Sequence, residues 1–109
     1  MGASKQMKSA KLGIVLQITD VTRRGTDGRS WVVHDVERNR GFRVNVNGAA
    51  LEESPAGEKK RSWSEDDVRG AIGVAIERFL LASPELVAGP LYDVEVTSED
   101  LHNYARLKK

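Results

Sequence analysis

The sequence predicts a small α+β domain, in which a three-stranded antiparallel meander is covered by one amphipathic helix and followed by a fourth strand and a short C-terminal helix. Two patterns support this prediction. Apolar and polar residues alternate along three successive segments separated by short turns, and a longer segment then repeats apolar residues every three or four positions. The first pattern is typical of strands with one buried face, and the second of a helix.

The first strand is predicted over residues 12–20, where branched apolar residues occupy every second position. These residues would share one face of a sheet; they are Leu12, Ile14, Leu16 and Ile18. The following segment, 24–28, contains two glycines and an aspartate, which favour a turn. We expect residues 12–109 to form a single domain, because a chain of 109 residues fits that size. Residues 1–11 are expected to be a flexible tail or an expression remnant.

The second strand is predicted over 30–38 and is apolar on both faces. Trp31 and Val33 would lie on one face, and Val32 and Val36 on the other. A third strand follows at 42–46 after a tight turn. Parallel pairing needs a crossover of about a dozen residues, so these short turns predict an antiparallel meander.

A loop is expected over 48–62, with a helical turn within 49–53. The covering helix is then predicted from Ser64 to about Ala82, because a serine followed by three acids is typical of a helix start. Apolar residues follow at helical spacing; they are Val68, Ile72, Ala75, Ile76, Phe79 and Leu80. A fourth strand at 91–97 and a short helix beginning near Thr97 complete the prediction.

Composition excludes several classes of site. The chain has no cysteine, so disulfides and cysteine-based metal sites are ruled out. No apolar run approaches the roughly 18 residues needed to cross a bilayer. The apolar stretch near the N-terminus is too short for a signal peptide and alternates as a strand does. We therefore expect a soluble, cytoplasmic protein with no membrane partner.

Catalytic and cofactor motifs are not apparent. His34 and Asp35 are adjacent, but neighbouring residues of a strand point to opposite faces, and His102 is the only other histidine. The acidic clusters occupy a loop and two predicted helix starts, where negative charge is favourable without catalysis. We therefore predict no catalytic, metal or cofactor site, although an enzyme with an unfamiliar site stays open.

The basic residues give one functional hypothesis. Residues 1–62 contain 12 basic and 7 acidic residues, a net charge of +5, whereas 63–109 contain 5 and 9, a net charge of −4. Guanidinium groups pair with phosphates, and an exposed indole can stack on a base. The candidate nucleic-acid contacts are Arg23, Arg24, Arg29, Lys59, Lys60, Arg61 and Trp63.

The two-sided second strand gives another hypothesis. One helix covers one face, so either Trp31 and Val33 or Val32 and Val36 must be covered by the C-terminal helix, by a second copy or by a partner. These four residues form the candidate interface. We therefore expect a non-enzymatic interaction module, a homodimer that binds a protein partner. The alternatives are a nucleic-acid-binding protein that uses the arginine- and lysine-rich loops, and an enzyme or small-molecule binder with a pocket at a dimer interface.

Overall fold

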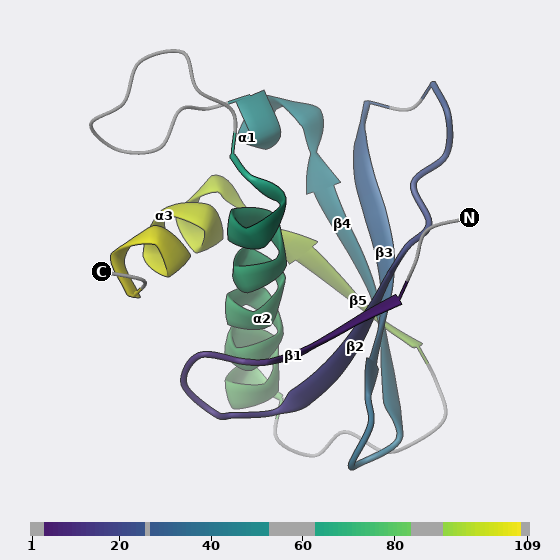
Figure 1. Ribbon diagram of the computed structural model, residues 1–109, viewed down its shortest axis with the longest axis vertical. Coiled ribbons are helices and arrows are strands. Elements are labelled where there is room, and N and C mark those ends of the chain that lie inside the picture. The colour runs from purple at the N-terminus through teal and green to yellow at the C-terminus, as the bar shows by residue number, and fades with distance from the viewer. Residues whose placement is uncertain (1–3, 26, 53–62, 84–90, 108–109) are drawn as a thin grey trace.

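A computed structural model describes residues 4–25, 27–52, 63–83 and 91–107 of the chain (Figure 1). It is an α+β domain with one five-stranded sheet in the order β1-β2-β3-β4-β5. The strands are β1 (Ser4–Lys8), β2 (Val15–Asp20), β3 (Gly28–Asp35), β4 (Arg40–Asn47) and β5 (Leu91–Val96). The helices are α1 (Gly48–Glu52), α2 (Glu65–Ala82) and α3 (Ser98–Leu107).

The meander predicted from the sequence is confirmed as β2, β3 and β4. Ile18 pairs with Val33, and Val33 with Phe42, in antiparallel register. The turn between β3 and β4 is closed by Asn39 with φ of 52°, a left-handed conformation that asparagine tolerates. Each strand therefore alternates its side chains between the same two faces.

The N-terminal segment differs from the expected tail. Ser4–Lys8 forms β1 and pairs antiparallel with β2, so the expectation of a tail over 1–11 is wrong for these residues. The turn after β1 passes through Gly13, whose φ is 64°. Leu12 lies in this turn and is exposed, whereas the alternation had placed it on the buried face. Its neighbour Ile14 is buried as expected.

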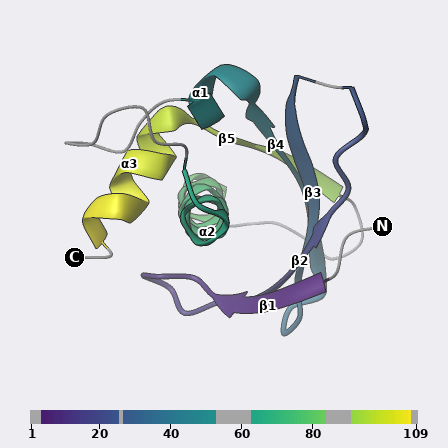
Figure 2. The same cartoon turned by 45° about the horizontal axis from the view of Figure 1, so that its top comes forward.

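The last strand, β5, joins the sheet beside β4 and runs parallel to it. A parallel pair requires a long crossover, and the segment that contains α1 and α2 provides it. Helix α2 crosses the inner face of the sheet, which curls around it so that β1 and β5 lie on opposite sides of the helix (Figure 2).

The start of α2 matches the sequence prediction. Ser64 is the N-cap, its hydroxyl accepts from the Asp67 N–H, and the Asp67 carboxylate accepts from the Ser64 N–H. This reciprocal capping box satisfies two helix-end donors. Two glycines allow α2 to pack closely on its neighbours. A Cβ at Gly70 would overlap the ring of Tyr104 in α3, and one at Gly73 would lie 3.2 Å from the Met7 methyl group in β1.

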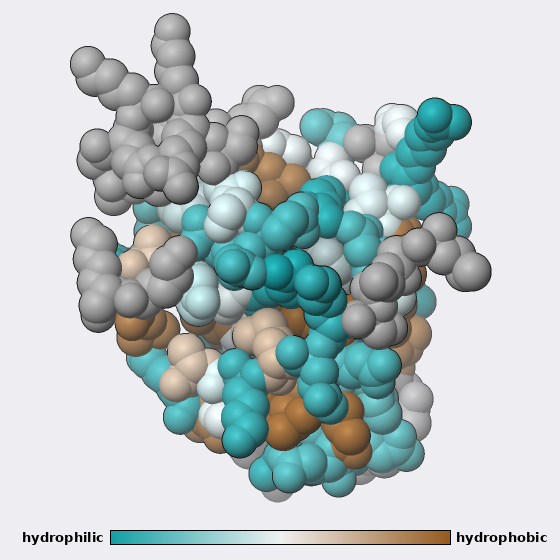
Figure 3. Space-filling model, viewed as in Figure 1, coloured by the Kyte–Doolittle hydropathy of each residue, from teal (hydrophilic) through white to brown (hydrophobic). Residues whose placement is uncertain are grey.

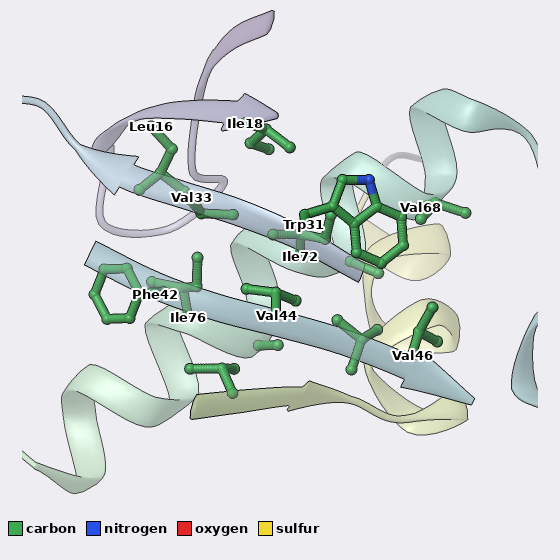
Figure 4. Close-up of a cluster of buried hydrophobic side chains, with 14 of the residues drawn as sticks. Leu16, Ile18, Trp31, Val33, Phe42, Val44, Val46, Val68, Ile72 and Ile76 are labelled. Atoms are coloured by element: carbon green, nitrogen blue, oxygen red, sulfur yellow. The ribbon is translucent and has the colours of Figure 1, made fainter. Parts of the chain in front are cut away.

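The core lies between α2 and the inner face of the sheet (Figure 4). Trp31, Val33 and Val44 point toward α2 from β3 and β4, and each is at most 2% exposed. Helix α3 packs against α2 and leaves the other face of the sheet uncovered (Figures 1 and 2). The two-sided character of β3 is therefore resolved, since Trp31 and Val33 belong to the core and Val32 and Val36 do not.

Candidate functional site

The face of the sheet opposite α2 carries no helix in the part of the chain that the structure describes. Its side chains come from alternate positions of neighbouring strands, and the register places them in rows. We call this surface the open face and define it by Val15, Gln17, Thr19, Ser30, Val32, His34, Val36, Arg43, Asn45, Leu91, Asp93 and Glu95.

The open face carries no permanent charge along β2 and β3. The outward residues of these strands are aliphatic, hydroxyl, amide or imidazole side chains. The charges lie on the flanking strands: Lys8 of β1 pairs with Val15 of β2, and on β4 and β5 the guanidinium of Arg43 is 3.8 Å from the carboxylate of Asp93. The charged residues of these strands, Asp20, Arg29 and Asp35, alternate onto the inner side of the sheet, so the absence of charge is confined to the outward positions.

Hydrogen bonds order part of the open face. The Ser30 hydroxyl donates to the Asn45 side-chain carbonyl at 2.8 Å, which links β3 to β4. The ring of His34 lies 3.0 Å from the side-chain oxygen of Asn39, in the turn after β3. These polar groups are therefore held in position on the strands while they stay accessible to solvent.

Exposed aliphatic side chains accompany these polar groups. Among the described residues, seven large hydrophobic side chains are exposed, and four of them lie on or beside the open face. They are Val21, Val32, Val36 and Leu91, with exposures of 44%, 37%, 43% and 48%. The register places these four side chains in separate rows, where they alternate with the polar groups.

The interface residues predicted from the sequence are divided between the two faces. Trp31 and Val33 are 2% and 0% exposed beneath α2, so they are not available to a partner. Val32 and Val36 are on the open face. The sequence did not identify Thr19, Asn45 and Leu91 as their neighbours, because that requires the register across β2, β4 and β5.

A groove of about 530 Å³ lies at the end of the open face near the turn between β2 and β3. Its lining includes Arg23, Ser30, Arg43 and Asn45. Both arginines are exposed, and the same lining includes the acid Asp27. Arg24, another predicted nucleic-acid contact, is also exposed in the same turn.

Arg29 is engaged in ion pairs rather than free. Its guanidinium pairs with Asp20 and lies 2.5 Å from Glu65, and it sits over the Trp31 ring at 5.0 Å. Burial alone would lower the pKa of Arg29, but the hydrogen bonds to Glu65 and Asp20 raise it. Arg29 therefore links β2, β3 and α2 at the edge of the core, and the two carboxylates compensate its charge.

Trp63 is also enclosed. Its side chain is buried before the start of α2, and its ring meets that of His102 edge to face at 5.1 Å. Its indole N–H has no hydrogen-bond partner among the described residues. This ring does not stack on a base in the conformation described. Lys59, Lys60 and Arg61 lie outside the described residues.

Within the described part of the chain, no group of three or more histidines, carboxylates or cysteines is placed to hold a metal ion. No described helix combines the length and apolar character that crossing a bilayer requires. Comparison with known proteins found no matching family model, no matching curated protein and no matching solved structure.

Proposed function

We propose that this chain is a non-enzymatic interaction module whose open face binds protein, and that the partner is a second copy, which gives a homodimer. The observation that carries this proposal is the uncharged surface along β2 and β3. Charged residues are depleted at the centres of protein interfaces because they lose hydration there without full compensation.

The arrangement of groups around that centre supports association of two copies. Val32 lies in the middle of the face, in one row with Thr19, Arg43 and Asp93. A two-fold axis brings the same patch of both copies together. Because the edge of this patch carries both a positive and a negative side chain, the positive group of one copy can face the negative group of the other. The exposed valines supply apolar area, and the side-chain amides supply hydrogen bonds.

Light scattering over a range of protein concentrations tests the proposal. The unmodified chain should show the mass of two copies at high concentration. Val32→Asp should weaken dimerisation by about 100-fold or more, since it buries an unpaired carboxylate in the interface. A dimer that survives this substitution, or a chain that is monomeric throughout and captures no defined protein, would overturn the proposal.

Leu81→Asp provides the matched control. Leu81 is 70% exposed on α2, on the other side of the sheet, and the substitution makes the same change in charge. It should leave the mass unchanged. Equal loss of dimer in both variants would show a general effect of charge rather than an interface at Val32. Circular dichroism of both variants checks that they fold.

Nucleic-acid binding is the second candidate, supported by Arg23 and Arg43 at the groove of the open face. It ranks lower because Arg29 and Arg43 already pair with carboxylates, and because Trp63 is buried. Fluorescence anisotropy with single-stranded DNA, duplex DNA and RNA at about 50 and 200 mM salt tests it. Saturable, salt-sensitive binding that is lost in an Arg23→Glu/Arg43→Glu variant would favour this candidate over the protein interface.

A further inference from the structure

A second hollow lies on the helical side of the molecule, away from the open face. It has a volume of about 370 Å³ and lies between α2, α3 and the turn that joins β1 to β2. Helix α2 lines it with a stripe of residues three and four positions apart, which lie along one side of a helix. This stripe consists of Val74, Glu77, Arg78 and Leu81. It is separate from the stripe of Val68, Ile72 and Ile76 that packs in the core.

The turn between β1 and β2 is fixed against α2 by Glu77. The carboxylate of Glu77 accepts from the backbone N–H groups of Lys11 and Leu12 at 2.8 and 2.6 Å, and the residue is 3% exposed. A buried carboxylate that is satisfied by two backbone donors holds its position strongly. This wall of the hollow is therefore already formed before a ligand arrives.

The opposite wall is fixed by the ion pair between Arg78 of α2 and Asp100 of α3. The two groups are 3.0 Å apart, and Arg78 also donates to the backbone carbonyl of Glu95 at 3.0 Å. The hydrogen bonds to Asp100 raise the pKa of Arg78. The carboxylate of Asp100 additionally accepts from the N–H of Thr97 and caps α3. Both acids of the hollow are thus buried and used within the fold.

The accessible groups of the hollow are apolar or cationic, apart from the Asn103 amide, whose oxygen accepts from the Arg106 guanidinium. Leu81 is 70% exposed and Leu107 is 44% exposed, and Val74 lies half-buried between the helices. Lys11 and Arg106 are exposed, and neither has a carboxylate within ion-pair distance among the described residues. Figure 3 shows this side of the molecule, with hydrophobic surface over α3 and the lower part of α2 between hydrophilic residues.

We infer that this hollow binds a small amphipathic monocarboxylate, whose apolar chain lies on Val74, Leu81 and Leu107 and whose carboxylate pairs with Lys11 or Arg106. The volume lies in the range of small-molecule sites, about 300 to 1,000 Å³. A cationic ligand is disfavoured because the two acids are already hydrogen-bonded inside the walls. A neutral ligand would gain no ion pair from Lys11 or Arg106, whereas a carboxylate would.

Isothermal titration calorimetry with decanoate, below its micelle concentration, tests this inference. Saturable binding is expected, and octanoate should bind about 15-fold more weakly, since it lacks two methylenes and each buried methylene contributes about fourfold in affinity. Decanol and decylammonium, which share the chain but not the anionic group, should also bind about tenfold more weakly. No saturable binding of decanoate, or stronger binding of decylammonium, would overturn the inference.

Substitutions locate the site. Arg106→Glu should weaken decanoate binding about tenfold and leave decanol binding unchanged, whereas Leu81→Asp should weaken both. Arg24→Glu is the matched control, because it makes the same charge change in the exposed turn between β2 and β3. Equal weakening by Arg24→Glu and Arg106→Glu would overturn the site, since it would reflect total charge alone. The homodimer proposal has a separate readout, since Val32→Asp should leave decanoate binding unchanged.

Discussion

The two faces of the sheet are made by the same strands, but they differ in burial and in residue type. On the inner face Leu16, Val33 and Val44 are completely buried. On the outer face Gln17, Val32 and Arg43 occupy the adjacent positions and are exposed. Alternation creates two surfaces from one chain segment, and the helix that packs on one of them determines which surface becomes the core.

Under the proposed function, this difference separates the residues that stabilise the fold from those that bind a partner. The inner face contributes the buried apolar area that stabilises the fold, so its side chains are constrained by volume and packing. The open face contributes little buried area in a single copy, so its composition is free to serve binding. Substitutions at neighbouring positions of one strand should therefore affect different measurements.

The pair Phe42 and Arg43 should show the largest contrast. Phe42 is fully buried and packs near Phe79 and Tyr92, with ring centroids 6.2 and 6.3 Å away. Phe42→Ala should lower the free energy of unfolding by about 4 kcal/mol, from lost burial and the cavity that remains. Arg43→Ala should change it by less than about 0.5 kcal/mol. Urea denaturation measures both, and equal losses would contradict the division between the faces.

Asp35 and His34 give a polar version of the same contrast. The Asp35 carboxylate is 0% exposed and accepts from Arg40 at 2.8 Å and from the backbone N–H of Arg38 at 3.2 Å. Asp35→Ala leaves the guanidinium of Arg40 without its counterion and should cost about 3 kcal/mol, measured by urea denaturation. His34→Ala, on the open face, should cost less than about 0.5 kcal/mol.

A double substitution checks the cause of this loss. If the unpaired guanidinium is responsible, Asp35→Ala combined with Arg40→Ala should be less destabilising than the sum of the single variants. Strict additivity would instead assign the loss to the Asp35 site alone, including its hydrogen bond with the backbone of Arg38.

Asp20 lies at the border between the inner face and solvent, and its substitution should have a smaller effect than those of Phe42 and Asp35. Burial alone would raise the pKa of Asp20, but hydrogen bonds from Thr22 and Arg29 outweigh it and hold the pKa below its usual value. Its stabilising effect is therefore complete above about pH 4 and is lost as the pH falls through the lowered folded-state pKa. Asp20→Asn should cost less than about 1 kcal/mol at neutral pH, because the pair is partly exposed.

Urea denaturation of the unmodified chain and of Asp20→Asn, between neutral and acid pH, measures the effect. The difference in free energy of unfolding between the unmodified chain and Asp20→Asn should disappear at low pH. A difference that stays constant between neutral and acid pH would indicate that the charge of Asp20 is not its source.

Local sequence signals predicted most of the elements. Ser64 and the following acids determine where α2 begins, and alternation locates β2, β3, β4 and β5, because both signals act between residues close in the chain. Strand β1 was missed because its sequence contains two lysines and only Met7 packs against the core. This segment forms a strand because its backbone pairs with β2, and its own residue pattern does not indicate that pairing.

The candidate sites were less predictable because they depend on contacts between distant segments. Val32 and Val36 were identified, but the choice between them and Trp31 with Val33 depends on which side α2 packs. The parallel pairing of β5 beside β4 brings Leu91 and Asp93 to the open face, and no local pattern encodes that position. The hollow between α2 and α3 likewise requires the ion pair of Arg78 with Asp100, 22 residues apart in the chain.

The crossover between β4 and β5 also has a consequence for the time course of synthesis. Strand β4 ends at Asn47, but the helix that covers the inner face is complete only at Ala82. At about 5 to 20 residues per second, a ribosome needs about two to seven seconds to add that segment. During this interval the meander has its pairing partners but not its cover, so the nascent chain exposes the apolar surface that the finished protein conceals.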